Sequence, residues 1–170
     1  MAGNRSCTVP FRRCFGKIAA LSAACLFAAA CSIEQVDPWF DVPDIGASSA
    51  QAIGLWIAGT IVYDNTLHPT TKVQTPSETI AVGRGNCGDL SLLMMYMIHR
   101  ELGGLPHFIN GTFIGADHAW VAWDGVSYES ESGGLVDDRY VAEWDFDYYA
   151  AMFQAETTHE LSPLFARRAS

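Results

Sequence analysis

The sequence predicts an α+β domain in which one long, buried helix carries a cysteine and packs on a small antiparallel sheet. Apolar residues recur at helical spacing after Cys87, whereas apolar and polar residues alternate after Pro106 and so indicate strands. The dipeptide Asp124-Gly125 between two of the alternating segments is typical of a tight hairpin. A helix packed on an antiparallel meander is an α+β layer arrangement.

The first 30 residues predict a signal peptide rather than part of the fold. Four basic residues precede the uncharged segment 18–30, which is too short to cross a membrane because a span needs about 20 apolar residues. The small residues before Cys31 resemble a lipoprotein signal, in which this cysteine is lipidated and becomes the first residue. The alternative is an ordinary cleavage site after the alanine-rich stretch. Either interpretation predicts export to the bacterial cell envelope, where the lipid would anchor the protein at the outer membrane or the periplasmic face.

Export sharpens the interpretation of the five cysteines. Cys7, Cys14 and Cys25 would leave with the signal peptide, and Cys31 would carry lipid. Cys87 would then remain as an unpaired thiol in an oxidising compartment, where exported domains usually pair their cysteines. Such a cysteine is expected to be either buried or used in chemistry.

The charge of the chain argues against nucleic acid as a partner. Without the four basic residues of the signal peptide, 6 lysines and arginines face 19 aspartates and glutamates, a formal net charge of −13. This surface repels phosphate backbones and anionic lipids. The expected contact with the membrane is therefore the lipid anchor alone.

The segments between the signal peptide and Cys87 predict a tether and two helices. Residues 31–47 contain prolines, a glycine and acids, which is typical of an irregular tether before a domain at 48–170. An apolar stripe predicts a helix over 48–63. The capping box at 75–78, with proline at the first helical position, predicts a short helix that ends before Cys87. His68 precedes a proline in the intervening polar loop and is interpreted as a solvated histidine.

A longer helix is predicted from Cys87 to Leu102, where Gly103-Gly104 provides a stop signal. Its apolar residues lie on one helical face, which is expected to pack against the sheet. These residues are Leu90, Leu93, Met94, Met97, Ile98 and Leu102. Alternation predicts strands at 107–114, 118–123 and 126–131, and the aromatic, acidic segment 140–155 is expected to form a terminal helix.

Cys87, His118 and a glutamate follow one another as a nucleophile, a base and an orienting acid. The unpaired N–H groups at a helix start favour a thiolate over a thiol at Cys87. Glu129 and Glu131 share one face of the strand beside that of His118, so either carboxylate is expected to accept the Nδ1 proton and leave Nε2 facing the thiol. Glu129 is preferred because it directly follows Tyr128, and the other glutamate is expected to be a solvated charge. The alternative for Cys87 is a buried structural cysteine.

Three segments carry a family resemblance, which covers residues 53–131. Residues 74–79, the Gly85-x-Cys87-x-Asp89 motif and His118-Ala119-Trp120-Val121 are similar to the transglutaminase-like cysteine enzymes, especially the bacterial cysteine-proteinase-like members. The resemblance implies a papain-like core with Cys87 as nucleophile and His118 as base. The family's third residue is usually aspartate, whereas this chain offers only glutamates. Asp89 matches the family's acid after the cysteine, but a structural role at the positive end of the helix dipole is preferred.

The predicted function is that of an exported thiol enzyme that cleaves or transfers an amide or peptide bond through a Cys-His-Glu triad and a thioester. Hydrolysis would make it a cysteine peptidase or amidohydrolase, and transfer to an amine would make it an acyltransferase; the substrate would be an envelope protein or peptide. The competing interpretation is a catalytically silent lipoprotein that binds or scaffolds. Zinc sites usually show close pairs such as Cys-x-x-Cys, which the sequence lacks, so neither a metal nor a cofactor is expected.

Overall fold

The computed structural model describes residues 41–69, 71–164 and 166–170. The predicted signal peptide, the predicted lipidation site Cys31 and most of the predicted tether lie outside these residues. The helices are α1 (Ala50–Thr60), α2 (Pro76–Val82), α3 (Cys87–Leu102) and α4 (Tyr148–Thr158). The strands are β1 (Val62–Tyr63), β2 (Arg84–Gly85), β3 (His107–Phe113), β4 (Ala116–Trp123), β5 (Val126–Tyr128), β6 (Tyr140–Phe146) and β7 (Arg167–Arg168). No helix within the described ranges is long and apolar enough to cross a membrane.

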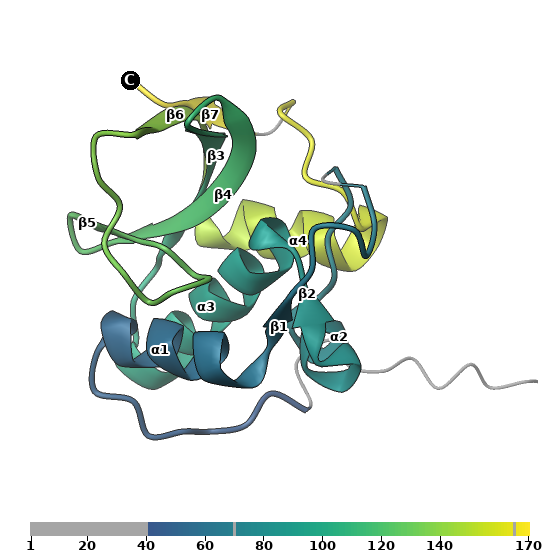
Figure 1. Cartoon of the computed structure of the whole chain (residues 1–170), viewed down its shortest axis with the longest axis vertical. Helices are drawn as coiled ribbons and strands as arrows, with labels where there is room; N and C mark the ends of the chain where they lie inside the picture. The colour runs from purple at the N-terminus through teal and green to yellow at the C-terminus, as the bar shows by residue number, and fades with distance from the viewer. Residues whose placement is uncertain (1–40, 70, 165) are drawn as a thin grey trace, which may run out of the picture. The chain divides into compact units, whose positions relative to one another are not determined.

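The main sheet has five strands in the order β5-β4-β3-β6-β7, and every neighbouring pair is antiparallel. Helix α3 packs on β4 and β3, and α1 contacts another side of α3 (Figure 1). A second, short parallel pair joins β1 to β2 immediately before α3. The predicted α+β class is therefore confirmed, with the cysteine-bearing helix packed on an antiparallel sheet.

Helix α3 is more deeply buried than its apolar stripe predicted. Its apolar residues are buried on several sides, apart from the half-buried Tyr96 and Leu102, because α1, α2 and α4 pack against parts of its surface that the sheet leaves uncovered. Its fully buried apolar side chains are those of Leu90, Leu92, Leu93, Met94, Met95, Met97 and Ile98. A helix with this burial makes a fixed platform for the residues of its first turn.

The ends of α2 and α3 follow the local capping signals. Thr75 caps α2 and forms a reciprocal capping box with Glu78. Asn86 caps α3, and Gly103 ends it in the left-handed conformation at φ 71°. Both predicted helix starts are confirmed.

The predicted terminal helix over 140–155 is wrong in its first half. Residues Tyr140–Phe146 form β6, which pairs with β3 and places this segment inside the sheet. Helix α4 begins only after Asp147, whose side chain accepts a hydrogen bond from the N–H of Ala150 at 2.9 Å. Pairing with a distant strand therefore overrode the helical interpretation of the segment.

The predicted strand 126–131 is too long, since β5 ends at Tyr128. The chain turns at Glu129, whose carbonyl accepts a hydrogen bond from the N–H of Gly133 at 2.8 Å. Gly133 has φ 68° and touches α1 so closely that a Cβ on Gly54 would lie 2.7 Å from its Cα. The contact with α1 fixes this turn, which carries Glu129 and Glu131.

Candidate active site

Cys87 occupies the first helical position of α3, between the two residues of a capping box. The side-chain oxygen of Asn86 accepts hydrogen bonds from the N–H groups of Gly88 at 2.9 Å and Asp89 at 3.2 Å. Asp89 in turn accepts a hydrogen bond from the N–H of Asn86 at 2.8 Å. Cys87 is a free, buried thiol with 7% of its surface exposed. The reciprocal hydrogen bonds hold the backbone on both sides of this thiol.

Asp89 also connects the start of α3 to the chain before α2 through hydrogen bonds. Its carboxylate is fully buried and accepts hydrogen bonds from the N–H of Gln74 at 2.7 Å and from Nε2 of His68 at 2.9 Å. Burial raises the pKa of Asp89 although its hydrogen bonds oppose this effect. The expectation that His68 is solvated is wrong, because its side chain is only 18% exposed and bonds to this carboxylate.

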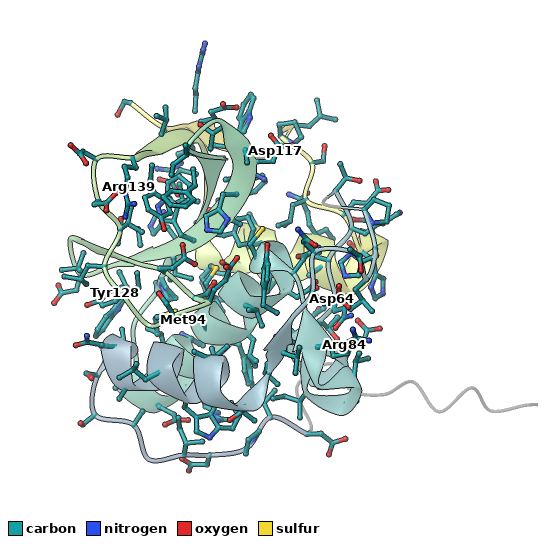
Figure 2. All side chains as sticks on the ribbon, viewed as in Figure 1. Asp64, Arg84, Met94, Asp117, Tyr128 and Arg139 are labelled. Carbon is teal, nitrogen blue, oxygen red and sulfur yellow. The ribbon has the colours of Figure 1, made fainter. Side chains whose placement is uncertain are left out.

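The β1–β2 pair brings Tyr63 to the site. Tyr63 pairs with Gly85, two residues before the thiol. Arg84 of β2 forms an ion pair at 2.6 Å with Asp64, which directly follows β1 (Figure 2). Burial and the negative charge of Glu131 raise the pKa of Tyr63. The tyrosine therefore keeps its hydroxyl proton beside the predicted catalytic residues.

His118 projects from β4 and joins the thiol to a carboxylate. Its Nε2 lies 2.7 Å from Oε2 of Glu129, and its ring also hydrogen-bonds with Cys87. Burial lowers the pKa of His118, but its hydrogen bonds with Cys87 and Glu129 and the negative charge of Glu129 outweigh this effect and raise the pKa to about 10. The imidazole is therefore protonated at neutral pH, which favours an ion pair with a thiolate.

The orientation of the imidazole is the reverse of the sequence-based expectation. Nε2 bonds to Glu129, whereas Nδ1 faces the side where Oε1 of Glu131 lies 3.8 Å away. Glu129 follows the end of β5 and approaches the outer end of the ring, since Nε2 is the nitrogen farther from the backbone. Nδ1 is therefore the nitrogen left to exchange a proton with Cys87.

Glu129 is held by donors on both of its oxygens. Oε2 accepts a hydrogen bond from the hydroxyl of Tyr140 at 2.8 Å as well as from His118, and Oε1 accepts one from the N–H of Glu131 at 3.1 Å. Burial by itself would raise the pKa of Glu129, but the hydrogen bond and charge of His118 lead the effects that hold it below its ordinary value. Tyr140 was not predicted as a site residue, although the alternation of Tyr140, Trp144 and Phe146 is a strand signal.

Glu131 differs from its prediction as a solvated charge. Its side chain is 25% exposed, and its Oε1 is buried without a hydrogen-bond partner. Burial raises the pKa of Glu131, and the negative charge of Glu129 raises it further, although the charge of His118 and a hydrogen bond with Tyr63 oppose this rise. The structure thus places both glutamates beside His118, but only Glu129 makes a close hydrogen bond to the ring.

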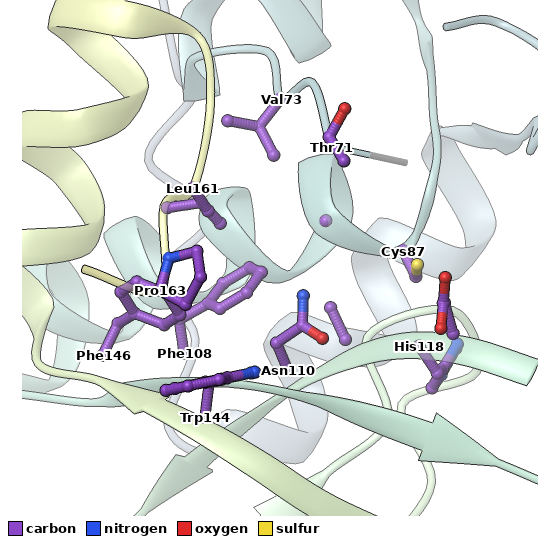
Figure 3. Close-up of a pocket in the computed structure, with 13 residues that line it drawn as sticks. Thr71, Val73, Cys87, Phe108, Asn110, His118, Trp144, Phe146, Leu161 and Pro163 are labelled. Atoms are coloured by element: carbon purple, nitrogen blue, oxygen red, sulfur yellow. The ribbon is translucent and has the colours of Figure 1, made fainter. Parts of the chain in front are cut away.

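Clefts open on two sides of the thiol. One cleft of about 210 Å³ is lined by polar and apolar groups in similar measure and reaches Cys87 and His118 at its end (Figure 3). Its apolar lining includes Val73, Phe108, Trp144, Phe146, Leu161 and Pro163. A second hollow beside the thiol is lined by Tyr63, Asn65 and Glu131. An extended substrate therefore has room on both sides of the thiol.

We expect His118 to lose its proton near pH 10 rather than near its ordinary pKa of 6.5. Because Glu129 contributes to this rise, Glu129→Gln is expected to move the titration to a lower pH. NMR of the imidazole carbons against pH measures both midpoints. Glu143→Gln, at an exposed position of β6, is the control and is expected to titrate as the unmodified protein does. Equal midpoints in the Glu129→Gln and unmodified proteins would contradict the assignment.

The fold and the site define an α+β domain with the Cys-His-carboxylate arrangement of a thiol enzyme. No family model and no curated protein matches the chain. The chain is similar to a solved structure named "Putative Cysteine Protease from Cytophaga hutchinsonii", with 19% identity and a TM-score of 0.41. The similar region covers 55% of this chain and 34% of that one, so this chain spans about a third of that protein's length.

Proposed function

We propose that this protein is an exported thiol hydrolase of the transglutaminase-like type, which cleaves an amide or peptide bond through Cys87, His118 and Glu129. The observation that carries the proposal is the hydrogen-bonded series from thiol to imidazole to carboxylate at the start of α3. A buried structural cysteine needs neither a charged partner nor a cleft, and Cys87 has both. The glutamate takes the place that aspartate usually has in the resembled family.

The proposed reaction proceeds in two steps. The thiolate of Cys87 attacks the substrate carbonyl, and the amine leaves with the proton from Nδ1 of His118, which gives a thioester. His118 then takes a proton from water, which attacks the thioester and releases the acid and the thiol. The N–H of Cys87, at the positive end of α3, is positioned to stabilise the oxyanion of each step. Glu129 keeps the imidazole oriented through both steps.

The clefts support a peptide-like substrate rather than a small amide. An extended chain across Cys87 would place one side chain among Phe108, Trp144 and Leu161 and the opposite part near Tyr63 and Asn65. An apolar side chain fits the first cleft because burial of apolar area favours binding. Water is the proposed second substrate, since hydrolysis needs no additional binding site for an amine.

Labelling with a thiol-reactive amide-hydrolase probe tests this function. The folded protein is expected to be labelled at Cys87, and denaturation before the probe is added should remove the labelling, because the reactivity depends on His118 and α3. Cys87→Ala is the matched control and should not be labelled. A ligand-binding activity or envelope phenotype that survives Cys87→Ala unchanged, together with an unlabelled wild-type protein, would instead support a binding or scaffolding lipoprotein.

We further propose that the protein is anchored through Cys31, which lies outside the described residues. The support is the uncharged segment 18–30 and the small residues before this cysteine. Mass spectrometry of the mature protein should detect an acylated amino-terminal Cys31. An unmodified amino terminus at another residue would contradict lipidation but not export.

A further inference from the structure

The proposed triad leaves one carboxylate at the site without a role. The carboxylate of Glu131 hydrogen-bonds with Tyr63. Its Oε1, however, is buried without a hydrogen-bond partner and lies 3.8 Å from Nδ1 of His118. Glu129 already holds the opposite nitrogen of the ring, so Glu131 is not needed to orient it. A buried oxygen without a donor is costly, which suggests that it has a ligand in some state of the protein.

The neighbours of this oxygen supply a mixed set of metal ligands. Cys87, His118 and Glu131 each place one sulfur, nitrogen or oxygen ligand atom within 4.8 Å of the other two. Bonds of about 2.0–2.3 Å in a tetrahedral zinc site put ligand atoms about 3.3–3.8 Å apart. The three atoms therefore need to move by about 1 Å or less to surround one ion. Sulfur and imidazole ligands favour Zn²⁺ or Co²⁺ over Ca²⁺ and Mg²⁺.

The surroundings of His118 also suit a metal ligand. Its Nε2 is held 2.7 Å from Glu129, and Glu129 is held in turn by the Tyr140 hydroxyl. A carboxylate that accepts the second N–H of a metal-bound histidine fixes the ring and makes the imidazole a better ligand. The hydrogen bond between Nε2 and Glu129 therefore orients the ring so that Nδ1 can bind an ion.

We propose that Cys87, His118 and Glu131 bind one Zn²⁺, with the fourth position open to water from the cleft. Binding needs Nδ1 of His118 without its proton and Cys87 as the thiolate. The bound ion occupies the thiolate and the base together and so blocks attack on a substrate. The blocking rests on the proposed function, whereas the binding does not. No close ligand pair marks the site in the sequence, because its residues meet only through the fold.

Titration of the full-length protein with Co²⁺ tests the site. One equivalent is expected to bind with a thiolate-to-cobalt charge-transfer band and the strong visible bands of tetrahedral cobalt, and Zn²⁺ should displace it. Cys87→Ser should remove the charge-transfer band. Glu131→Gln should weaken binding at least about 10-fold, and Glu129→Gln should weaken it about 10-fold to 100-fold by loosening the imidazole.

Glu143→Gln is the matched control, since Glu143 is an exposed carboxylate of β6 and is not one of the three ligands. It should bind Co²⁺ as tightly as the unmodified protein. Wild-type protein without a charge-transfer band would overturn the site, and equal affinities of Glu131→Gln and wild type would remove Glu131 from it. Probe labelling without Co²⁺ binding overturns only the metal site. Co²⁺ binding without probe labelling contradicts only the proposed enzyme function.

Discussion

Replacement of Cys87 by alanine is expected to reduce turnover by about 10³-fold or more, to the background rate. His118→Ala should have an effect of similar size, because a nucleophile and its base act as one unit. The double variant should lose little more than either single variant. Release of p-nitrophenol from an activated ester measures these rates, with an initial burst in the unmodified protein if the thioester accumulates.

The two glutamates provide a graded control for this result. Glu129→Gln should reduce turnover about 10-fold to 100-fold. The amide orients the imidazole less well than the carboxylate, but the thiol and the base remain. Glu131→Gln should cost less, because its Oε1 lies 3.8 Å from the ring against 2.7 Å for Glu129. A larger loss in Glu131→Gln than in Glu129→Gln would reassign the third residue. Ester turnover that persists in Cys87→Ala would remove the thiol from the mechanism.

Features set by neighbouring residues could be predicted from the sequence. The capping box at Thr75 and the glycine stop at Gly103 each act within one turn of helix, and both helix ends lie where these signals place them. The order of Cys87, His118 and the glutamates was also sufficient to identify the group that the fold brings together. The local signals and the order of these residues were therefore enough to predict which side chains meet at the site.

Features set by distant pairing could not be predicted in the same way. The segment Tyr140–Phe146 is aromatic and acidic, and it becomes a strand because β3 offers a free edge for it to pair with. The choice between Glu129 and Glu131 depended on where β5 ends, which is decided by the contact of Gly133 with α1. The same turn sets which imidazole nitrogen meets the carboxylate.

His68 illustrates the largest gap between the sequence and the site. The residue lies in a polar loop before a proline, and nothing local indicates a partner. In the fold it bonds to Asp89, 21 positions later in the chain, at 2.9 Å. This bond joins the loop before α2 to the helix start that carries Cys87.

Asp89→Ala is expected to destabilise the domain by about 3 kcal/mol or more. The carboxylate is fully buried and accepts hydrogen bonds from Gln74, Asn86 and His68, and each donor left without an acceptor costs about 1–3 kcal/mol. Asp89→Asn should destabilise the domain less, since the asparagine keeps the volume and one acceptor oxygen. Its NH2 group, however, would face one of the N–H donors. Urea unfolding followed by circular dichroism measures the difference in free energy of unfolding.

Asp117→Asn serves as the control for stability, because Asp117 is exposed and its replacement should change the free energy of unfolding by less than about 0.5 kcal/mol. A loss below about 1 kcal/mol in Asp89→Ala would show that the three donors find other acceptors or water. The Asp89 variants should also lose probe labelling at Cys87 even under conditions where the domain remains folded, since Asn86 holds the first turn of α3 only while Asp89 holds Asn86. Folded Asp89→Asn protein that is labelled at the unmodified rate would contradict this coupling and leave Asp89 with a role in stability alone.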